Sequence, residues 1–349
     1  MTLSKNKNKR ITVKDVAAAL GVNPSTVSRA LSPEKQHLVS DRVIELVEKK
    51  SREMGYTANP MATALKCGAT KTIGMMIPDI LNPMFPPLVH EIQQLTNKLG
   101  YTLTLAYTEN NQELALEELK RLIARNVDGI ILASAFRKDP TVDYCIEMGK
   151  PLVQVNRVVD KQVSDQVLVD DREGIYVLFE HLYSLGHRKI AHIAGPADIS
   201  PGLSRRHAFL SIADMFDIPA SDAPVIQAEA FTEQAGRNAM EILLSSERDV
   251  TAVVATNDLV ALGCIEAIEA SGKRVPGDIS VTGFNDMPYL DWFRIPLTTV
   301  SLPQSQLGDQ AVRMLLSQIR KESDSSFPRK VLLQPKLVVR KSTGKPIKH

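Results

Sequence analysis

The sequence predicts an α/β protein with a three-helix, helix-turn-helix head and a body of two doubly wound parallel-sheet lobes. Two short helical patterns, each with capping residues, lie within the first 31 residues. From Lys71 onward, short apolar runs alternate with helical patterns, which is typical of parallel sheets covered by helices on both faces. A length of 349 residues exceeds one ordinary core. We therefore expect a head over residues 1–57, a connecting segment over 58–70 and a body over 71–349.

The body is predicted from its repeating order of elements. Apolar runs are followed by helical patterns such as the one through Leu88, Ile92, Leu95 and Leu99. Roughly ten strands are expected, more than one sheet comfortably holds, which favours two sheets. The apolar runs lie at 72–78, 101–106, 129–134, 151–156, 189–194, 250–256 and 279–284. In such folds ligands bind at the carboxyl ends of the strands, here in a cleft between the lobes.

Composition excludes several classes of protein. Hydrophobic residues make up 44% and charged residues 23% of the chain, as in soluble globular proteins. No apolar run follows the basic N-terminal residues, so a secretory signal is not expected. Apolar stretches such as 129–133 are too short to span a bilayer, so no membrane partner is expected. The three cysteines are scattered and form no CxxC, which argues against disulfides or structural zinc and fits a cytoplasmic protein.

Charge is distributed unevenly along the chain. Residues 1–71 contain 13 Lys and Arg against 6 Asp and Glu, whereas acidic residues are in excess over the remainder. A basic head on a mildly acidic body is typical of a polyanion-binding module fused to a separate domain. A solvated basic tail is the alternative, because Lys5, Lys7, Lys9 and Arg10 alone supply four of the charges.

The head is predicted from its capping residues. Thr12 and Asp15 resemble a capping box, and Gly21 ends the helix that follows. Asn23 is suited to cap the next helix, with Pro24 at its first position, where the missing N–H is harmless. A third helix is expected to start at Ser40 and end near Gly55. Helix, Gly-containing turn and helix fit a helix-turn-helix.

The second of these helices has the residues that a DNA-reading helix needs. A recognition helix enters the major groove with its N-terminal residues against base edges. Small side chains at Pro24, Ser25 and Thr26 allow close approach, and Arg29 can make a bidentate contact with guanine. An ordinary surface helix with small polar residues is the alternative, which the capped partner helix and the basic charge make the weaker interpretation.

The segments ITVKDVAAALGVNPSTVSRAL and GYTANPMATALK resemble the head of the lactose-repressor/galactose-repressor family of bacterial transcription regulators. The resemblance implies that residues 59–66 form a hinge helix that folds in the DNA minor groove, where Leu65 parts a base step. A short helix with no core is marginal on its own, and a plain linker is the alternative. A linker that folds upon binding satisfies both interpretations. The residues expected to contact DNA are Thr12, Asn23, Pro24, Ser25, Thr26, Ser28, Arg29, Asn59, Ala62, Leu65 and Lys66.

The body resembles the periplasmic sugar-binding protein fold that this family also uses. The resemblance implies three crossings between lobes, with lobe 1 near 71–169 and 301–330 and lobe 2 near 170–300 and 331–345. Arg205 matches an Arg that pairs with ligand oxygens, and Phe231 matches an aromatic side chain that stacks on the ligand. The residues expected to bind effector are Met84, Phe85, Asn156, Arg157, Asp170, Arg205, Phe231, Asn257 and Asn285. Each polar member has an alternative role as a loop cap or interlobe ion pair.

One position departs from the family pattern. Asn285 occupies a position that is usually an Asp accepting sugar hydroxyls. An amide donates and accepts hydrogen bonds but carries no charge. Because the carboxylate is lost while Arg157 and Arg205 are kept, the sequence favours a negatively charged effector, such as a sugar acid or sugar phosphate.

Two other classes of function are the alternatives. An enzyme is disfavoured because GxGxxG, GxxxxGK[ST], GxSxG and HExxH are all missing from the sequence, and no cofactor or metal is expected. His181, His187 and His192 are better explained as packing and capping groups than as a catalytic or metal cluster. A transporter's solute-binding protein would need an export signal and no helix-turn-helix. The resemblance implies a homodimeric repressor of carbohydrate-metabolism genes that binds double-stranded operator DNA and a small-molecule effector.

Overall fold

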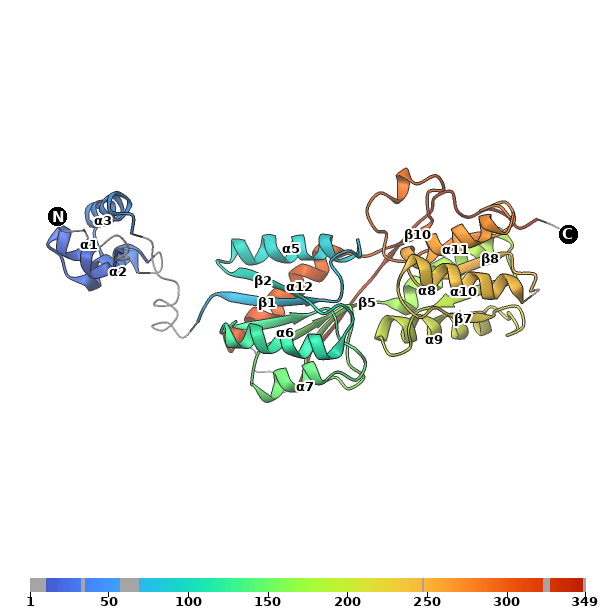
Figure 1. Cartoon of the computed structure of the whole chain (residues 1–349), viewed down its shortest axis with the longest axis horizontal. Coiled ribbons are helices and arrows are strands. Elements are labelled where there is room, and N and C mark those ends of the chain that lie inside the picture. Colours follow the sequence, from blue (N-terminus) through green and yellow to red (C-terminus); the bar gives the residue numbers. More distant parts are fainter. Residues whose placement is uncertain (1–10, 33–34, 57–68, 247, 323–326, 348–349) are drawn as a thin grey trace, which may run out of the picture. The chain divides into compact units, whose positions relative to one another are not determined.

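The computed structural model of the chain describes residues 11–32, 35–56, 69–246, 248–322 and 327–347 (Figure 1). The chain forms two compact units divided between Thr70 and Lys71. This division agrees with the predicted start of the body. The predicted hinge residues Asn59, Ala62, Leu65 and Lys66 lie outside the described residues. No helix of the described part is both long and apolar enough to cross a membrane.

The head is a three-helix unit, and its predicted caps form. Helix α1 (Val13–Leu20) starts with a Thr12–Asp15 capping box and ends at Gly21, whose φ of 66° favours glycine. Helix α2 (Pro24–Ala30) has Pro at its first position, and after the short 3₁₀ turn η1 (Gln36–Leu38), α3 (Asp41–Met54) completes the unit. The small core contains Val16, Ala17, Val27, Ala30 and Val47.

Lobe 1 is built on a six-stranded parallel sheet in the order β11-β5-β4-β3-β1-β2. Its strands are β1 (Thr72–Ile77), β2 (Thr102–Tyr107), β3 (Gly129–Leu132), β4 (Leu152–Val155), β5 (Asp165–Val169) and β11 (Lys330–Leu333). One face is covered by α5 (Phe85–Lys98) and α12 (Gln304–Ile319), the other by α6 (Gln112–Ala124) and α7 (Pro140–Glu147) (Figure 1). Ile131 belongs to the first core and its neighbours Ile130 and Leu132 to the second, as alternating strand residues require.

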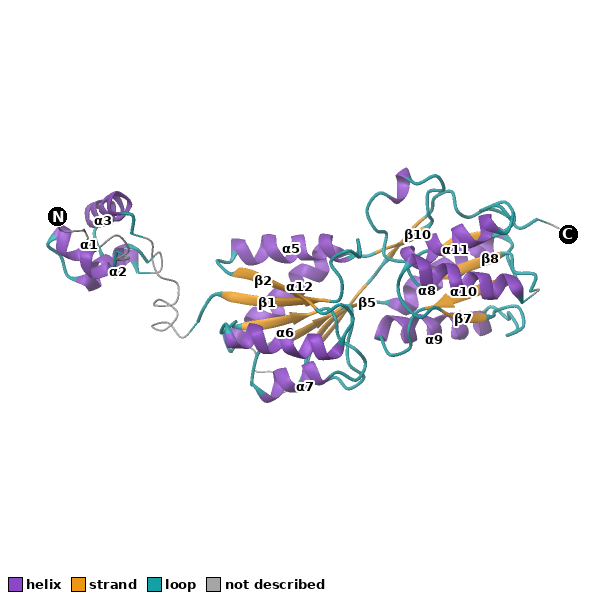
Figure 2. Cartoon of the chain, viewed as in Figure 1, coloured by secondary structure: helices purple, strands orange, loops and turns teal. Residues whose placement is uncertain are grey.

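Lobe 2 repeats the arrangement on a four-stranded parallel sheet in the order β7-β6-β8-β9 (Figure 2). Its strands are β6 (Ile190–Ala194), β7 (Val225–Gln227), β8 (Ala252–Ala255) and β9 (Ser280–Thr282). Helices α8 (Asp171–Leu185) and α9 (Ser200–Met215) pack on one face, and α10 (Glu233–Ser245) and α11 (Asp258–Ala270) on the other. A short turn, η2 (Leu290–Trp292), follows β9, and β10 (Thr299–Ser301) pairs with β12 (Lys336–Val338). The predicted doubly wound fold of both lobes is confirmed.

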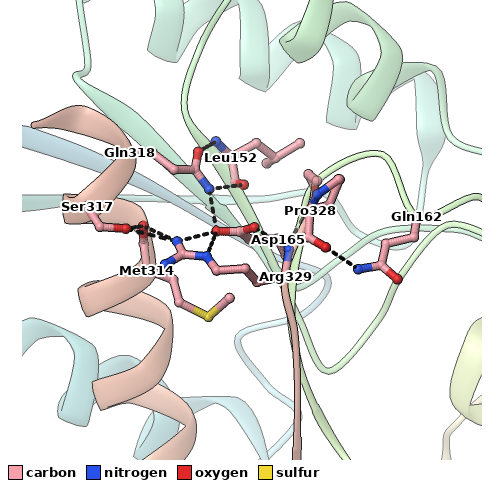
Figure 3. Close-up of polar contacts among 9 residues, drawn as sticks. Leu152, Gln162, Asp165, Met314, Ser317, Gln318, Pro328 and Arg329 are labelled. Carbon is pink, nitrogen blue, oxygen red and sulfur yellow. Dashed lines mark hydrogen bonds and ion pairs between the residues drawn. The ribbon is translucent and has the colours of Figure 1, made fainter. Parts of the chain in front are cut away.

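One predicted boundary is wrong. Residues from 331 onward were assigned to lobe 2, but β11 pairs in parallel with β5 and completes the lobe 1 sheet. The reason is a polar cluster at the start of this strand (Figure 3). The backbone N–H and the guanidinium of Arg329 both donate to the Asp165 carboxylate, and Gln318 of α12 donates to it as well. The chain therefore returns to lobe 2 only after Leu333.

Candidate DNA-binding surface and ligand pocket

The N-terminus of α2 is held by its own side chains. Asn23 Oδ1 accepts hydrogen bonds from the backbone N–H of Ser25 at 3.0 Å and from Ser25 Oγ at 2.8 Å. Together with Pro24 at the first helical position, these bonds start the helix abruptly and leave three short side chains at its tip. The backbone at this tip is therefore accessible to a large partner.

The exposed face of α2 carries the residues predicted to read DNA. Asn23, Pro24, Ser25 and Arg29 are exposed, and Thr26 and Ser28 are partly exposed. Val27 and Ala30 point into the core of the head. The Arg29 guanidinium makes no hydrogen bond or ion pair within the described residues, so it is available to a ligand. Thr12 is exposed at the start of α1, where its hydroxyl contacts Asp15.

A pocket in the body lies at the carboxyl ends of strands from both lobes. Eight of the nine residues predicted to bind effector line it. Lobe 1 contributes the segments that follow β1 and β4, and lobe 2 contributes α9 and the segments that follow β7, β8 and β9. The lining residues are Asn82, Met84, Phe85, Asn156, Arg157, Pro201, Arg205, Phe231, Asn257 and Asn285.

Arg205 is tied into lobe 2 by several contacts. Its Nε donates to Asp171 Oδ1 at 2.8 Å and its Nη1 donates to the carbonyl of Thr256 at 2.6 Å. The guanidinium also lies over the Phe284 ring, 3.7 Å from the ring centroid. The side chain is 3% exposed, so these contacts fix its position before any ligand arrives.

Arg157 is held differently from Arg205. Its Nη1 donates to Asn110 Oδ1 at 2.7 Å, and its guanidinium carbon lies 5.7 Å from the centroid of the Phe231 ring. Only 4% of the residue is exposed. Burial lowers the pKa of Arg157 to about 10, although Asp198 and Asp79 act in the opposite direction. Within the described residues it forms no ion pair, so a buried cation lines the pocket without a direct counterion.

Four asparagines give the pocket neutral hydrogen-bonding groups. Asn82 Oδ1 accepts from the Met84 N–H and Asn257 Oδ1 accepts from the Val260 N–H, which leaves their amide nitrogens free of these bonds. Asn156 and Asn285 have φ values of 65° and 119°, a region that asparagine adopts more readily than most residues. These two residues sit at sharp turns just after strands, where a ligand can approach.

Asp170 is the one predicted effector residue that the pocket leaves out. Its Oδ1 accepts the N–H of Glu173 at 3.0 Å, so it caps helix α8. The alternative role of a strand-end cap explains this residue. Asn82 and Pro201 line the pocket but were missed. Asn82 lies in the loop after β1 that also carries the predicted residues Met84 and Phe85, so its amide side chain could have indicated a role in the site. Pro201 has no polar side chain and gave no such indication.

Asp258, next to Asn257, has a supporting role. Its carboxylate accepts hydrogen bonds from the Met287 N–H and from the Thr299 hydroxyl. Burial raises the pKa of Asp258 to about 6. These bonds tie the loop after β9, which carries Asn285, to the start of α11.

The histidines have ordinary structural contacts. The ring of His187 contacts Thr251, Ser280 and the carbonyl of Gly344, and buried His192 stacks on Phe209. Burial lowers the pKa of His192 to about 4. Among the described residues, no group of His, Cys, Asp and Glu side chains is suited to hold a metal ion.

An exposed, capped helix-turn-helix and a two-lobed body with a polar pocket together define a class of protein, the ligand-responsive transcription regulator. Comparison with known proteins identifies the family. Residues 12–59 match the model for bacterial regulatory proteins of the lacI family, and residues 179–343 match that of a periplasmic binding protein-like domain.

Relatives match over nearly the whole chain. The HTH-type transcriptional repressor PurR of Pasteurella multocida is 32% identical over 332 residues, which cover 95% of this chain and 98% of the relative. The ribose operon repressor of Halalkalibacterium halodurans is 30% identical over 332 residues, 95% and 97% of the two chains. The chain therefore belongs to the lacI family of bacterial regulatory proteins.

Solved structures agree with this assignment. A lac repressor dimer bound to operator and the anti-inducer ONPF superposes with a TM-score of 0.83 at 27% identity, covering 96% of this chain and all of that chain. A LacI family transcriptional regulator from Enterococcus faecium with bound ribose gives a TM-score of 0.69 at 28% identity, covering 78% and 99% of the two chains.

Proposed function

We propose that the protein is a homodimeric repressor of carbohydrate-metabolism genes, which binds operator DNA through α2 and is controlled by an effector in the pocket between the lobes. The observation that carries the proposal is full-length similarity to two repressors, combined with a pocket lined by the predicted effector residues. Action on the bacterial chromosome places the protein in the cytoplasm. The relatives are repressors, which favours regulation over catalysis.

In the proposed complex, each head reads half of a pseudo-palindromic operator. Pro24, Ser25 and Thr26 let the backbone approach the bases, and Arg29 donates two hydrogen bonds to a guanine. Exposure of this tip and the unpaired state of Arg29 in the described head support these roles. Thr12, Asn23 and Ser28 are proposed to position the head on phosphates.

The segment 58–70 is proposed to couple the two functions. Asn59, Ala62 and Lys66 contact the minor groove while Leu65 parts the central base step. Effector binding shifts the lobes and thereby changes the separation of the paired hinges, so the folded hinge on DNA becomes more or less stable. In this scheme DNA and effector both shift the same equilibrium, that between the folded and the unfolded hinge.

The test begins with duplex fragments that the protein selects from a random pool. Wild-type binding is measured by fluorescence anisotropy over a series of salt concentrations, since phosphate contacts make the affinity fall steeply with salt. Arg29→Ala is expected to cost about 1–3 kcal/mol on the selected site. Arg29→Lys keeps the charge but loses the bidentate donor. It should reduce the preference for one base pair more than it reduces the affinity for non-specific DNA.

Lys49→Ala is the charge-matched control, because Lys49 is an exposed cation on α3 outside the proposed reading face. It should leave the preferred sequence unchanged. A protein that prefers no duplex sequence at any salt concentration, yet turns over a metabolite, would overturn the proposal in favour of an enzyme. Binding of a sugar without any DNA preference would favour a solute-binding protein.

A further inference from the structure

The pocket has an unbalanced set of charged groups. Its ten lining residues include two arginines and four asparagines but no aspartate or glutamate. Neutral amides satisfy hydroxyl groups by both donating and accepting. They do not compensate a guanidinium charge. The charge balance of the pocket therefore depends on what each arginine contacts behind the lining.

Arg205 is compensated within the protein. Asp171 pairs with its Nε, and this carboxylate is 18% exposed, so the pair is largely shielded from water. The Thr256 carbonyl accepts from a second nitrogen of the same guanidinium. Arg205 can still contact a ligand, but it already has its counterion.

Arg157 is not compensated in this way. Its side-chain hydrogen bond in the described structure goes to Asn110, a neutral amide. Asp79 and Asp198 influence it electrostatically but do not form an ion pair with it. Asp198 is exposed and Asp79 partly exposed, so water screens both carboxylates. A buried charge without a partner is costly, and the cost is recovered when a ligand supplies the opposite charge.

Two further polar atoms beside the pocket lack partners. Thr256 Oγ1 and Gln304 Oε1 are buried and make no hydrogen bond in the described part of the chain. Thr256 immediately precedes Asn257, and the Gln304 amide contacts the carbonyl of Met84, so both adjoin pocket-lining residues. Neither residue lines the pocket, so these two atoms add polar groups around it without contacting a ligand directly.

We propose that the effector is a polyhydroxylated anion whose carboxylate or phosphate pairs with Arg157 while its hydroxyls bind the asparagines. This inference rests on the proposed function, because it names the class of molecule that the same pocket takes. A guanidinium suits either anion, since its planar donors match both carboxylate and phosphate.

The experiment is isothermal titration of the full-length protein with matched compounds. The carboxylate arm is D-gluconate, D-glucuronate and D-galacturonate, and the phosphate arm is glucose 6-phosphate and ribose 5-phosphate. The neutral arm is D-glucose, D-galactose and D-ribose. We expect at least one acid or phosphate to bind about tenfold or more tightly than its neutral counterpart.

Variants test the assignment to Arg157. Arg157→Gln should weaken the best anion by about 30-fold or more, because the ligand's charge is then buried without a partner. Arg172→Gln removes an exposed arginine of α8 outside the pocket and serves as the charge-matched control, with no change in affinity expected. Asn285→Asp adds a carboxylate to the lining and should weaken the same anion by about tenfold while favouring its neutral counterpart.

Circular dichroism and thermal unfolding of each variant establish that it is folded. Equal or tighter binding of neutral sugars, an unchanged anion affinity in Arg157→Gln, or no binding by any anion at millimolar concentration would each overturn the inference. The proposed function is tested separately by the DNA preference of the wild type without ligand, so either idea can fail alone.

Discussion

The Asp165 carboxylate offers a test of what holds β11 in lobe 1. Four donors converge on it: the Arg329 backbone N–H, Arg329 Nε and Nη2, and Gln318 Nε2, at 2.5–3.0 Å (Figure 3). In Asp165→Asn, one oxygen remains as an acceptor and the new amide NH₂ faces donors. The Arg329 N–H bonds to Oδ1 and the other three donors bond to Oδ2, so the variant loses at least the bond to one oxygen, and with it the charge that opposes Arg329.

The magnitude follows from burial. Each hydrogen bond to a charged group contributes about 1.5–3 kcal/mol, so losing the single bond to Oδ1 costs about that much, and loss of the charge weakens the three bonds that remain. Asp165 is 7% exposed but Arg329 is 37% exposed, so water replaces part of what is lost. We expect the free energy of unfolding to fall by about 2–4 kcal/mol. At about 2–4 °C per kcal/mol, the melting temperature should fall by roughly 4–16 °C.

The assay is differential scanning calorimetry of the full-length protein, with Asp309→Asn as the matched control. Asp309 also pairs with an arginine, Arg313, but on the solvent-exposed side of α12, where an ion pair contributes about 0–1 kcal/mol. If Asp165→Asn lowers the melting temperature no more than Asp309→Asn does, the polar cluster is not what stabilises β11.

Three further predictions concern the hinge, the pocket and pH. Leu65→Ala should weaken operator binding about tenfold or more and leave effector affinity unchanged, because it removes the proposed wedge; unchanged operator affinity in anisotropy contradicts this role. Gly195→Ala places a methyl group 2.5 Å from the Phe231 ring, so titration should show weaker effector binding, whereas Gly344→Ala, with 3.5 Å to its nearest neighbour, should not. Burial raises the pKa of Asp258 from 3.8 to about 6, so the folded chain binds this proton more tightly than the unfolded chain. The stability of the wild type relative to Asp258→Asn should therefore fall between about pH 4 and pH 6 and then level off; a flat urea-unfolding difference would contradict this.

The head could be predicted almost residue by residue because its signals are local. A capping box, an Asn–Pro helix start and a glycine with positive φ each act within a few residues, and all three occur where expected. Strands β1, β3 and β4 were likewise found from their apolar runs, since both faces of a parallel sheet are covered.

Strand β5 was missed because it does not look apolar. Its first residues, Asp165 and Gln166, are polar yet buried, and Asp165 is satisfied by Arg329 and Gln318 from far along the chain. Long-range pairing of this kind leaves no local pattern. Strand β11 likewise depends on a contact between residues far apart in the sequence, that of Arg329 with Asp165. The edge strand β7 has only three residues and little burial, so it also leaves no apolar run.

The position of the pocket could be expected from the sequence because strand ends in a doubly wound fold mark its edge. Polar residues just after β4, β8 and β9 had to meet there, and they do. Asp170 follows β5 equally closely but caps α8 instead. Sequence cannot separate these two roles, since a carboxylate at the start of a helix is suited to both.

Strand β1 has a mechanical consequence for how a signal travels. It begins at Thr72, directly after the connecting segment, and its end at Ile77 is followed by the loop that carries Asn82. Six residues span roughly 20 Å. The strand is bonded to β2 on one side and β3 on the other, so it cannot stretch or slip by itself. If the proposed coupling holds, motion at the pocket reaches the start of β1 as displacement of the entire sheet. Substitutions that loosen β1 should then leave effector binding and DNA binding intact but remove the effect of one on the other.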